Sequence, residues 1–295
     1  NNGSMAGTYT HEGSIDIGYD AWPGQTPEAP GEYVIGVIDL GIDETNPDLA
    51  GVLWSGEVFG PGGDSHGYFE AQAEGVSSTL GLTGTHGTHV AGIIASEWNG
   101  QGVSGVASNV KLMSLRFDGG MSSALKCLNY AKLAVEGGVN LLAINNSWAL
   151  ASCSSDIVNI AVTELGELGV VNVFATGNDS ANTDKMMDTA ATIAANPYVV
   201  AVNSISPDGN KANYSNYGIG TTDVCAPGSL ILSTVLNKAD SLEFMGEVNA
   251  HAQEGSEARQ NLVSYTSFDK EDVNAFESFS IVVSPEGEQC GSVIQ

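Results

Sequence analysis

Residues 86–92, His-Gly-Thr-His-Val-Ala-Gly, are the most informative part of this sequence. Two glycines bracket a histidine-rich turn that leads into an apolar run, which predicts a helix from Val90 to Ser96. A histidine at the start of such a helix can project into a cleft from a rigid backbone. Because its ordinary pKa suits proton transfer near neutral pH, His86 is a candidate general base. Taken alone, the motif fits a capped helix with two incidental histidines equally well.

Two buried strands on either side of this motif end in polar residues. The first, residues 33–39, ends in Asp39, and the second, residues 170–175, is followed closely by Asn178. Further strand patterns at 111–117, 140–145 and 198–202 alternate with amphipathic helical patterns at 121–135 and 156–168. Continuous Val/Ile runs and this alternation predict an α/β fold with a doubly wound parallel sheet. Ligands of such sheets bind at the carboxyl ends of the strands, where Asp39 is expected.

Five motifs occur in the order found in the subtilisin-like serine proteases (subtilases, peptidase S8 family). They are Asp-x-Gly at 39–41, the His-Gly-Thr-His stretch, Asn-Asn-Ser-Trp at 145–148, Gly-Asn at 177–178 and Ala-Pro-Gly at 226–228. The chain resembles this family from about Ile15 to Val235. The resemblance implies a serine endopeptidase that acts on polypeptides, with His86 as general base, Asp39 orienting it and Asn178 as the oxyanion donor. His89 is expected to pack beside the helix as a structural residue.

The resemblance also implies a substrate pocket and a calcium site. One pocket wall would be Ser147, Trp148 and Ala149, and the opposite wall Ala175, Thr176 and Gly177. Calcium takes six to eight oxygen ligands, and the glycine-rich loop at 97–103 can turn carbonyl groups inward. By resemblance, the ligands are Asp48, Asn99 and the carbonyls of Glu97, Gln101 and Val103. An ordinary glycine-rich helix exit is the alternative interpretation of that loop.

The sequence departs from the family at three places. Leu40 stands where Thr or Ser is usual, and Ala149 stands where glycine is usual. After Pro227 there is no Gly-Thr-Ser segment, which carries the nucleophile in the family. Ser256 and Ser292 lack its flanking residues. We therefore expect the serine beyond residue 295, and we expect the 295-residue chain alone to be inactive.

Composition divides the chain into three parts. We expect a surface segment at 1–30, an incomplete catalytic domain at 31–235, and an acidic, β-rich, truncated insertion at 236–295. Acidic residues outnumber basic ones 35 to 9, for a net charge of −26, which argues against nucleic acid or an anionic membrane as a partner. No apolar run is long enough for membrane insertion. We expect secretion directed by a targeting segment outside this chain, and allow for a cleaved pro-segment as a partner. The four cysteines fit no metal spacing, and their pairing stays open.

Two other functions fit parts of the sequence. One is a catalytically inactive pseudoprotease, or peptide-binding protein, that keeps the cleft. The other is an α/β domain whose activity, for example adhesion, belongs to the acidic C-terminal part. The presence of Asp39, His86 and Asn178 together favours the endopeptidase, because a binding protein has no chemical need for all three.

Overall fold

The computed structural model describes residue 17 and residues 32–69, 85–100, 102–117, 119–148, 155–185 and 193–236. The expected segment at 1–30 and the expected insertion at 236–295 lie outside these ranges, apart from Ile17 and Leu236. Ala149 and Gln101 also lie outside them.

The described residues form one eight-stranded sheet, in the order β2-β3-β4-β1-β5-β6-β7-β8. All neighbouring strands are parallel except β2 and β3. This confirms the predicted parallel α/β sheet. From β1 the chain builds β2, β3 and β4 on one side of β1 and then crosses from β4 to β5 on the other side. The direction in which strands are added therefore changes beside β1, which is where α/β sheets place ligands. The strands are β1 (Tyr33–Asp39), β2 (Gly63–Asp64), β3 (Gly67–Phe69), β4 (Val110–Arg116), β5 (Leu141–Asn146), β6 (Val171–Ala175), β7 (Val199–Ile205) and β8 (Val224–Pro227).

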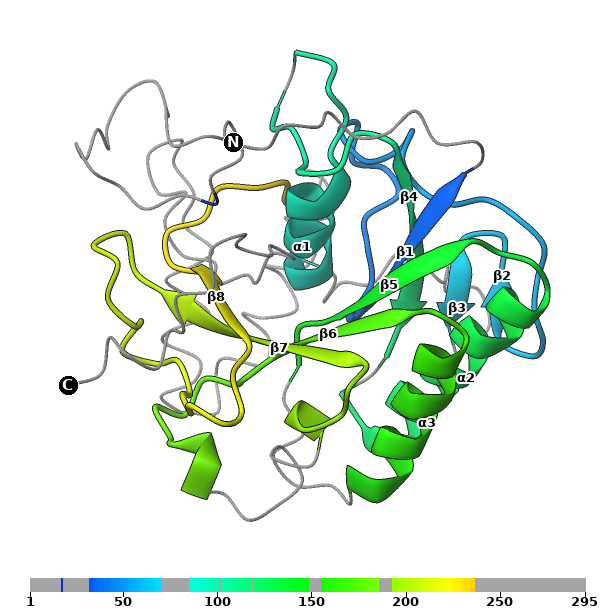
Figure 1. Cartoon of the computed structure of the whole chain (residues 1–295). Coiled ribbons are helices and arrows are strands. Elements are labelled where there is room, and N and C mark those ends of the chain that lie inside the picture. Colours follow the sequence, from blue (N-terminus) through cyan, green and yellow to red (C-terminus); the bar gives the residue numbers. More distant parts are fainter. Residues whose placement is uncertain are drawn as a thin grey trace, which may run out of the picture.

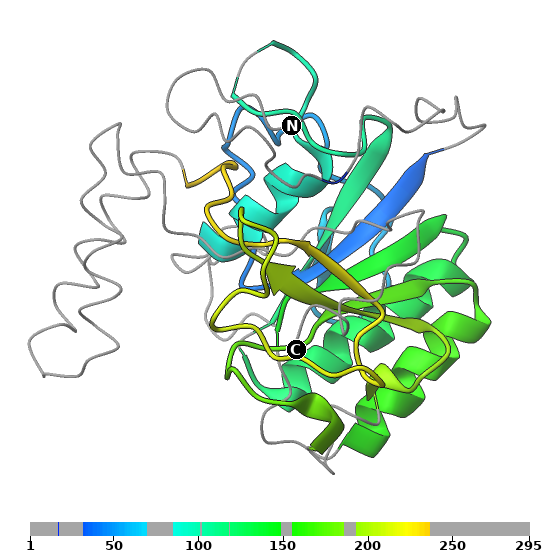
Figure 2. The same cartoon turned by 60° about the vertical axis from the view of Figure 1, so that its left-hand side comes forward.

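Helices lie on both faces of the sheet (Figures 1 and 2). Alternate residues of β1 show this directly, because Val34 and Ile38 pack with α2 and α3 while Val37 packs with α1. The helices are α1 (Thr85–Ala95), α2 (Met121–Glu136) and α3 (Ser155–Glu167), with a 3₁₀ turn, η2, at Thr183–Lys185.

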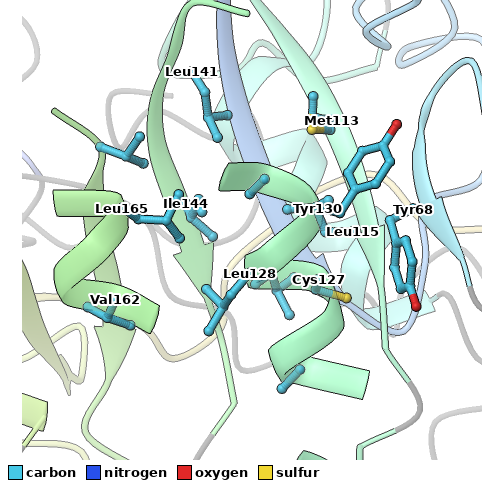
Figure 3. Packing of buried hydrophobic residues seen from close by; sticks show 14 of the residues in the cluster. Tyr68, Met113, Leu115, Cys127, Leu128, Tyr130, Leu141, Ile144, Val162 and Leu165 are labelled. Carbon is cyan, nitrogen blue, oxygen red and sulfur yellow. The ribbon is translucent and has the colours of Figure 1, made fainter. Parts of the chain in front are cut away.

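The larger core lies between the sheet and α2 and α3 (Figure 3). Leu128 and Ala131 of α2 are fully buried, and Met121, Leu125 and Val135 pack at the edge of the same cluster. These five residues are the apolar stripe that predicted the helix, so period and packing agree.

The structure differs from the sequence-based elements in two respects. Helix α1 begins at Thr85, five residues earlier than predicted, so His86 lies in its first turn. The polar run 85–89 carries no apolar period, and contacts with the loop after β1 decide its conformation. Strands β2, β3 and β8 were not predicted, because they are two to four residues long and too short to show alternation.

Candidate active site

Asp39 and His86 form a close pair at the carboxyl end of β1. His86 Nδ1 lies 2.8 Å from Asp39 Oδ2 and 3.0 Å from Oδ1. The Asp39 side chain is only 3% exposed and the His86 side chain 33% exposed. A carboxylate facing Nδ1 requires the ring proton on that nitrogen, so Nε2 is the nitrogen that can accept a proton. The backbone N–H of Leu40 donates to Asp39 Oδ1 at 2.7 Å, so a hydrogen bond to this carboxylate is present despite the leucine.

Glycine at position 87 lets the helix approach the loop after β1 closely enough for this pair. A Cβ there would collide with the carbonyl oxygen of Gly41 and lie 3.0 Å from Asp39 Cβ. The next residue, Thr88, is fully buried, and its Oγ1 accepts from the backbone N–H of Asp43 at 2.9 Å. The start of α1 is therefore fixed against the end of β1 on one side.

His89 occupies the other side of α1, where it is 2% exposed. Its Nε2 lies 3.1 Å from the carbonyl oxygen of Ile231, and burial lowers the pKa of His89 to about 4. Ser233 Oγ donates to the carbonyl of His89 at 2.6 Å and Thr234 Oγ1 to that of Thr88 at 2.7 Å. The segment after β8 thus runs alongside α1 (Figures 1 and 2), which agrees with a packing position for His89.

Asn178 is exposed and follows β6, two strands from β1 in the same sheet. Because β1, β5 and β6 are parallel, Asn178 shares the carboxyl edge of the sheet with Asp39. The loop it belongs to is held by Asn216, a buried residue that the sequence analysis did not single out. A polar residue between two strands carries no periodic signal that would have found it.

Residues from both predicted pocket walls line the same pocket. A pocket is lined by Trp148 from one wall and by Ala175 and Thr176 from the other. The remaining described lining is uncharged: Phe174, Thr183, Ile193, Ala194, Val199, Ala201 and Thr221. Ser147 directly precedes Trp148, and Gly177, with φ +105°, directly follows Thr176.

Residues 97–100 and 102–103 lie next to Asp48, which is 6% exposed. Asp48 Oδ2 accepts from the Val103 N–H at 2.8 Å, and Oδ1 lies 3.4 Å from Asn99 Nδ2. The Glu97 N–H donates to the Asp48 carbonyl at 3.0 Å. A Cβ at Gly102 would run into the Asp48 carboxylate, so the loop backbone packs directly against this side chain. Within the described ranges no three His, Cys, Asp or Glu side chains cluster as a metal site, so any cation here would depend on amide and carbonyl oxygens.

None of the helices in the described part of the chain is long and apolar enough to cross a membrane.

Comparison with known proteins gives consistent matches. The Peptidase S8 model, which describes the subtilase family, matches residues 31–269. The chain is 31% identical over 249 residues to an extracellular protease of Xanthomonas campestris pv. campestris, covering 76% of this chain and 41% of that protein. It is 30% identical over 209 residues to the major intracellular serine protease of Bacillus subtilis, covering 69% and 60%. The chain therefore spans less than two thirds of either relative.

Among solved structures, a cold adapted subtilisin-like serine proteinase shares the fold with a TM-score of 0.51 and 22% identity, over 85% of this chain and 89% of that one. The family model covers most of the chain. Asp39 at the end of β1 contacts His86 in α1, and the two residues follow one another in the sequence in the order of the family's motifs. The chain belongs to the subtilase family of serine proteases.

Proposed function

We propose that the protein is a serine endopeptidase of the subtilisin type. The observation that carries this proposal is the contact of His86 Nδ1 with both oxygens of Asp39. A buried carboxylate in that position fixes the tautomer and orientation of the imidazole and stabilises the imidazolium that forms when the ring takes a proton.

His86 is the general base in this mechanism. Its Nε2 takes the proton of a serine Oγ as that oxygen attacks the scissile carbonyl, and later returns the proton to the leaving amine. Asn178 donates to the oxyanion of the tetrahedral intermediate, and a single donor of this kind changes kcat by about 10²–10³. Family membership and the shared sheet edge support these two roles.

The third member of the triad is a serine outside the sequence given. No Gly-Thr-Ser segment occurs in the 295 residues, and the relatives are longer than the region matched. We propose that the full-length protein supplies this serine beyond residue 295, and that the 295-residue chain alone does not hydrolyse peptides.

Peptide hydrolysis by the full-length gene product tests this function. We expect cleavage of a casein-like substrate, labelling by a serine-directed reagent, and a loss of kcat of order 10⁴ for Asp39→Asn, as in other triads. His66→Gln is the matched control, because His66 Nδ1 contacts the Trp54 carbonyl and not Asp39. A full-length protein that binds peptides but is neither active nor labelled is a pseudoprotease. Labelling of the 295-residue chain itself would place the nucleophile within it.

The uncharged pocket between Trp148 and Thr176 supports binding of a substrate side chain there. Ser147, Trp148 and Ala149 would form one wall and Ala175, Thr176 and Gly177 the other, with the extended substrate adding a strand at the edge. The described lining carries no charge, so we expect an uncharged residue before the scissile bond.

Calcium would be held by the loop around Asp48. Support for this proposal comes from the buried Asp48 carboxylate, an oxygen ligand of the kind calcium prefers, and from Asn99, Gly102 and Val103, which lie next to it. The proposed ligands are Asp48, Asn99 and the carbonyls of Glu97, Gln101 and Val103. The ion would fix the loop and supply no chemistry to the reaction.

Secretion is supported by similarity to an extracellular protease and by a disulfide at Cys225 whose partner lies outside the described residues. Disulfides persist mainly in oxidising compartments. Similarity to an intracellular protease of Bacillus subtilis points the other way, so cell fractionation of the source organism is the test.

A further inference from the structure

The loop that follows β6 contains two residues with positive φ angles, one of which is not glycine. Gly177 has φ +105°, and Ser180 has φ +56°, an uncommon conformation for a residue with a side chain. Asn178, Asp179 and Ser180 are all exposed. Such a conformation persists only when the surroundings impose it.

Ser180 is held by the carbonyl groups of Tyr214 and Asn213, and Asn216 supplies the contacts on either side of Asn178. Asn216 lies in the connection between β7 and β8 and is 3% exposed. Its Nδ2 donates to the carbonyl of Thr176 at 2.9 Å, and its Oδ1 accepts from the N–H groups of Asp179 and Ala181, both at 2.9 Å. Its backbone N–H donates to the carbonyl of Gly177 at 2.8 Å. These bonds bracket Asn178 on both sides.

Asn216 is itself tied to the sheet. Its neighbour Ser215 is fully buried, and Ser215 Oγ accepts from the N–H of Ser204 in β7 at 3.0 Å. The same hydroxyl donates to the carbonyl of Asn216 at 3.0 Å. Hydrogen bonds through Ser215 and Asn216 therefore connect β7 to the loop after β6.

We propose that Asn216 is a positioning residue for Asn178. Resting on the proposed function, this inference assigns to Asn216 the task of holding the oxyanion donor where charge develops. A preorganised donor stabilises the transition state more than one that must be ordered during the reaction. The amide is suited to this because it donates to one side of the loop and accepts from the other.

A carboxylate at position 216 cannot replace the amide. In the Asn216→Asp variant, the ionised side chain would keep the acceptor for Asp179 and Ala181 and lose the donor to Thr176. It would also face Asp179 Oδ2, which now lies 3.3 Å from Asn216 Nδ2, and like charges at this distance repel. Asn216→Asp is therefore a near-isosteric change that disturbs the loop.

The test is a double-mutant cycle on kcat in the full-length protein. We expect Asn216→Ala to lower kcat by about 10- to 100-fold, because displacements of about 1 Å cost rates of this order, with KM within about twofold. In an Asn178→Ala background the same substitution should change kcat by less than about threefold, since the donor it positions is gone. If Asn216→Ala does not fold, Asn216→Asp takes its place in the cycle.

Asn196→Ala is the matched control for stability. Asn196 is also buried, and its side chain binds Asn159 Oδ1, Thr163 Oγ1 and the N–H of Tyr198, before the amino end of β7. This variant should lower the melting temperature and leave kcat nearly unchanged.

The outcomes separate the inference from the proposed function. An active wild type in which the Asn216 and Asn178 effects on kcat multiply, or in which the Asn196 variant loses as much kcat, overturns the positioning role alone. A wild type without reagent-sensitive activity overturns both.

Discussion

Lowering the pH from 7 to 4 should destabilise the protein through His89. The ring is buried under the segment after β8, where Nε2 lies against the carbonyl of Ile231. Burial is the main reason that the pKa of His89 falls from 6.5 to about 4, the bond to Ile231 opposes the fall, and the charge of His86 adds to it. The folded protein thus keeps this ring neutral at a pH where the unfolded chain protonates it.

The sign and size of the effect follow from proton linkage. Between pH 6.5 and about 4 the unfolded state binds a proton at His89 that the folded state does not, so the free energy of unfolding falls as the pH falls. The difference between the two pKa values corresponds to about 3 kcal/mol. The whole contribution is present above pH 6.5 and is lost near pH 4.

Urea denaturation of the wild type and His89→Gln at several pH values measures it. Glutamine can still donate to the Ile231 carbonyl but cannot be protonated, and a serine-directed reagent prevents self-digestion. The free-energy difference between the two proteins should shrink by about 3 kcal/mol from pH 7 to pH 4, because the other titrating groups cancel. Stability curves that run parallel across this range would refute the argument.

Two further changes test the same region and the calcium site. Gly87→Ala should lower both the melting temperature and kcat, because overpacking against Gly41 and Asp39 costs about 1–3 kcal/mol and exceeds the gain of about 1 kcal/mol in helix propensity. Thermal melts and kinetics on the full-length protein measure these changes. Unchanged values would contradict the close approach of α1 to the loop after β1. Calcium at about 100 times its Kd should stabilise the protein by about 2.7 kcal/mol. Asp48→Ala should abolish this effect, and Asp208→Ala, at an exposed position, should retain it. A melting temperature that does not change with calcium would contradict the proposed site.

The fold could be predicted to the extent that its elements carry a period. The Val/Ile run of β1 and the apolar stripe of α2 are long enough to reveal a buried strand and a half-buried helix, and both occur where expected. The start of α1 could not be found in this way, because residues 85–89 are polar and glycine-containing. Their helical conformation depends on contacts with Gly41 and Asp43, which lie more than 40 residues away in sequence.

The candidate site divides in a similar way. Asp39 ends one recognisable strand and Asn178 closely follows another, and parallel strands bring their carboxyl ends to one edge, so their placement could be predicted. Their roles came from the resemblance to the subtilases. Asn216 could not, since its importance comes from hydrogen bonds to a loop 35 to 40 residues earlier in the sequence. A buried amide in a connection between strands looks the same in sequence whether it braces a functional loop or only its own turn.

The position of His86 is set from two sides, and this explains how a one-third-exposed side chain can keep a fixed orientation. On the sheet side, the Asp43 N–H binds Thr88 Oγ1 and the loop leaves no room for a Cβ at position 87. On the opposite side, Ser233 and Thr234 donate to carbonyls of the same helical turn. One set of contacts comes from residues that precede α1 in the sequence and the other from residues that follow β8, so the position of the base depends on both ends of the described chain. Loss of the contacts after β8 should therefore loosen His86 even though Asp39 remains intact.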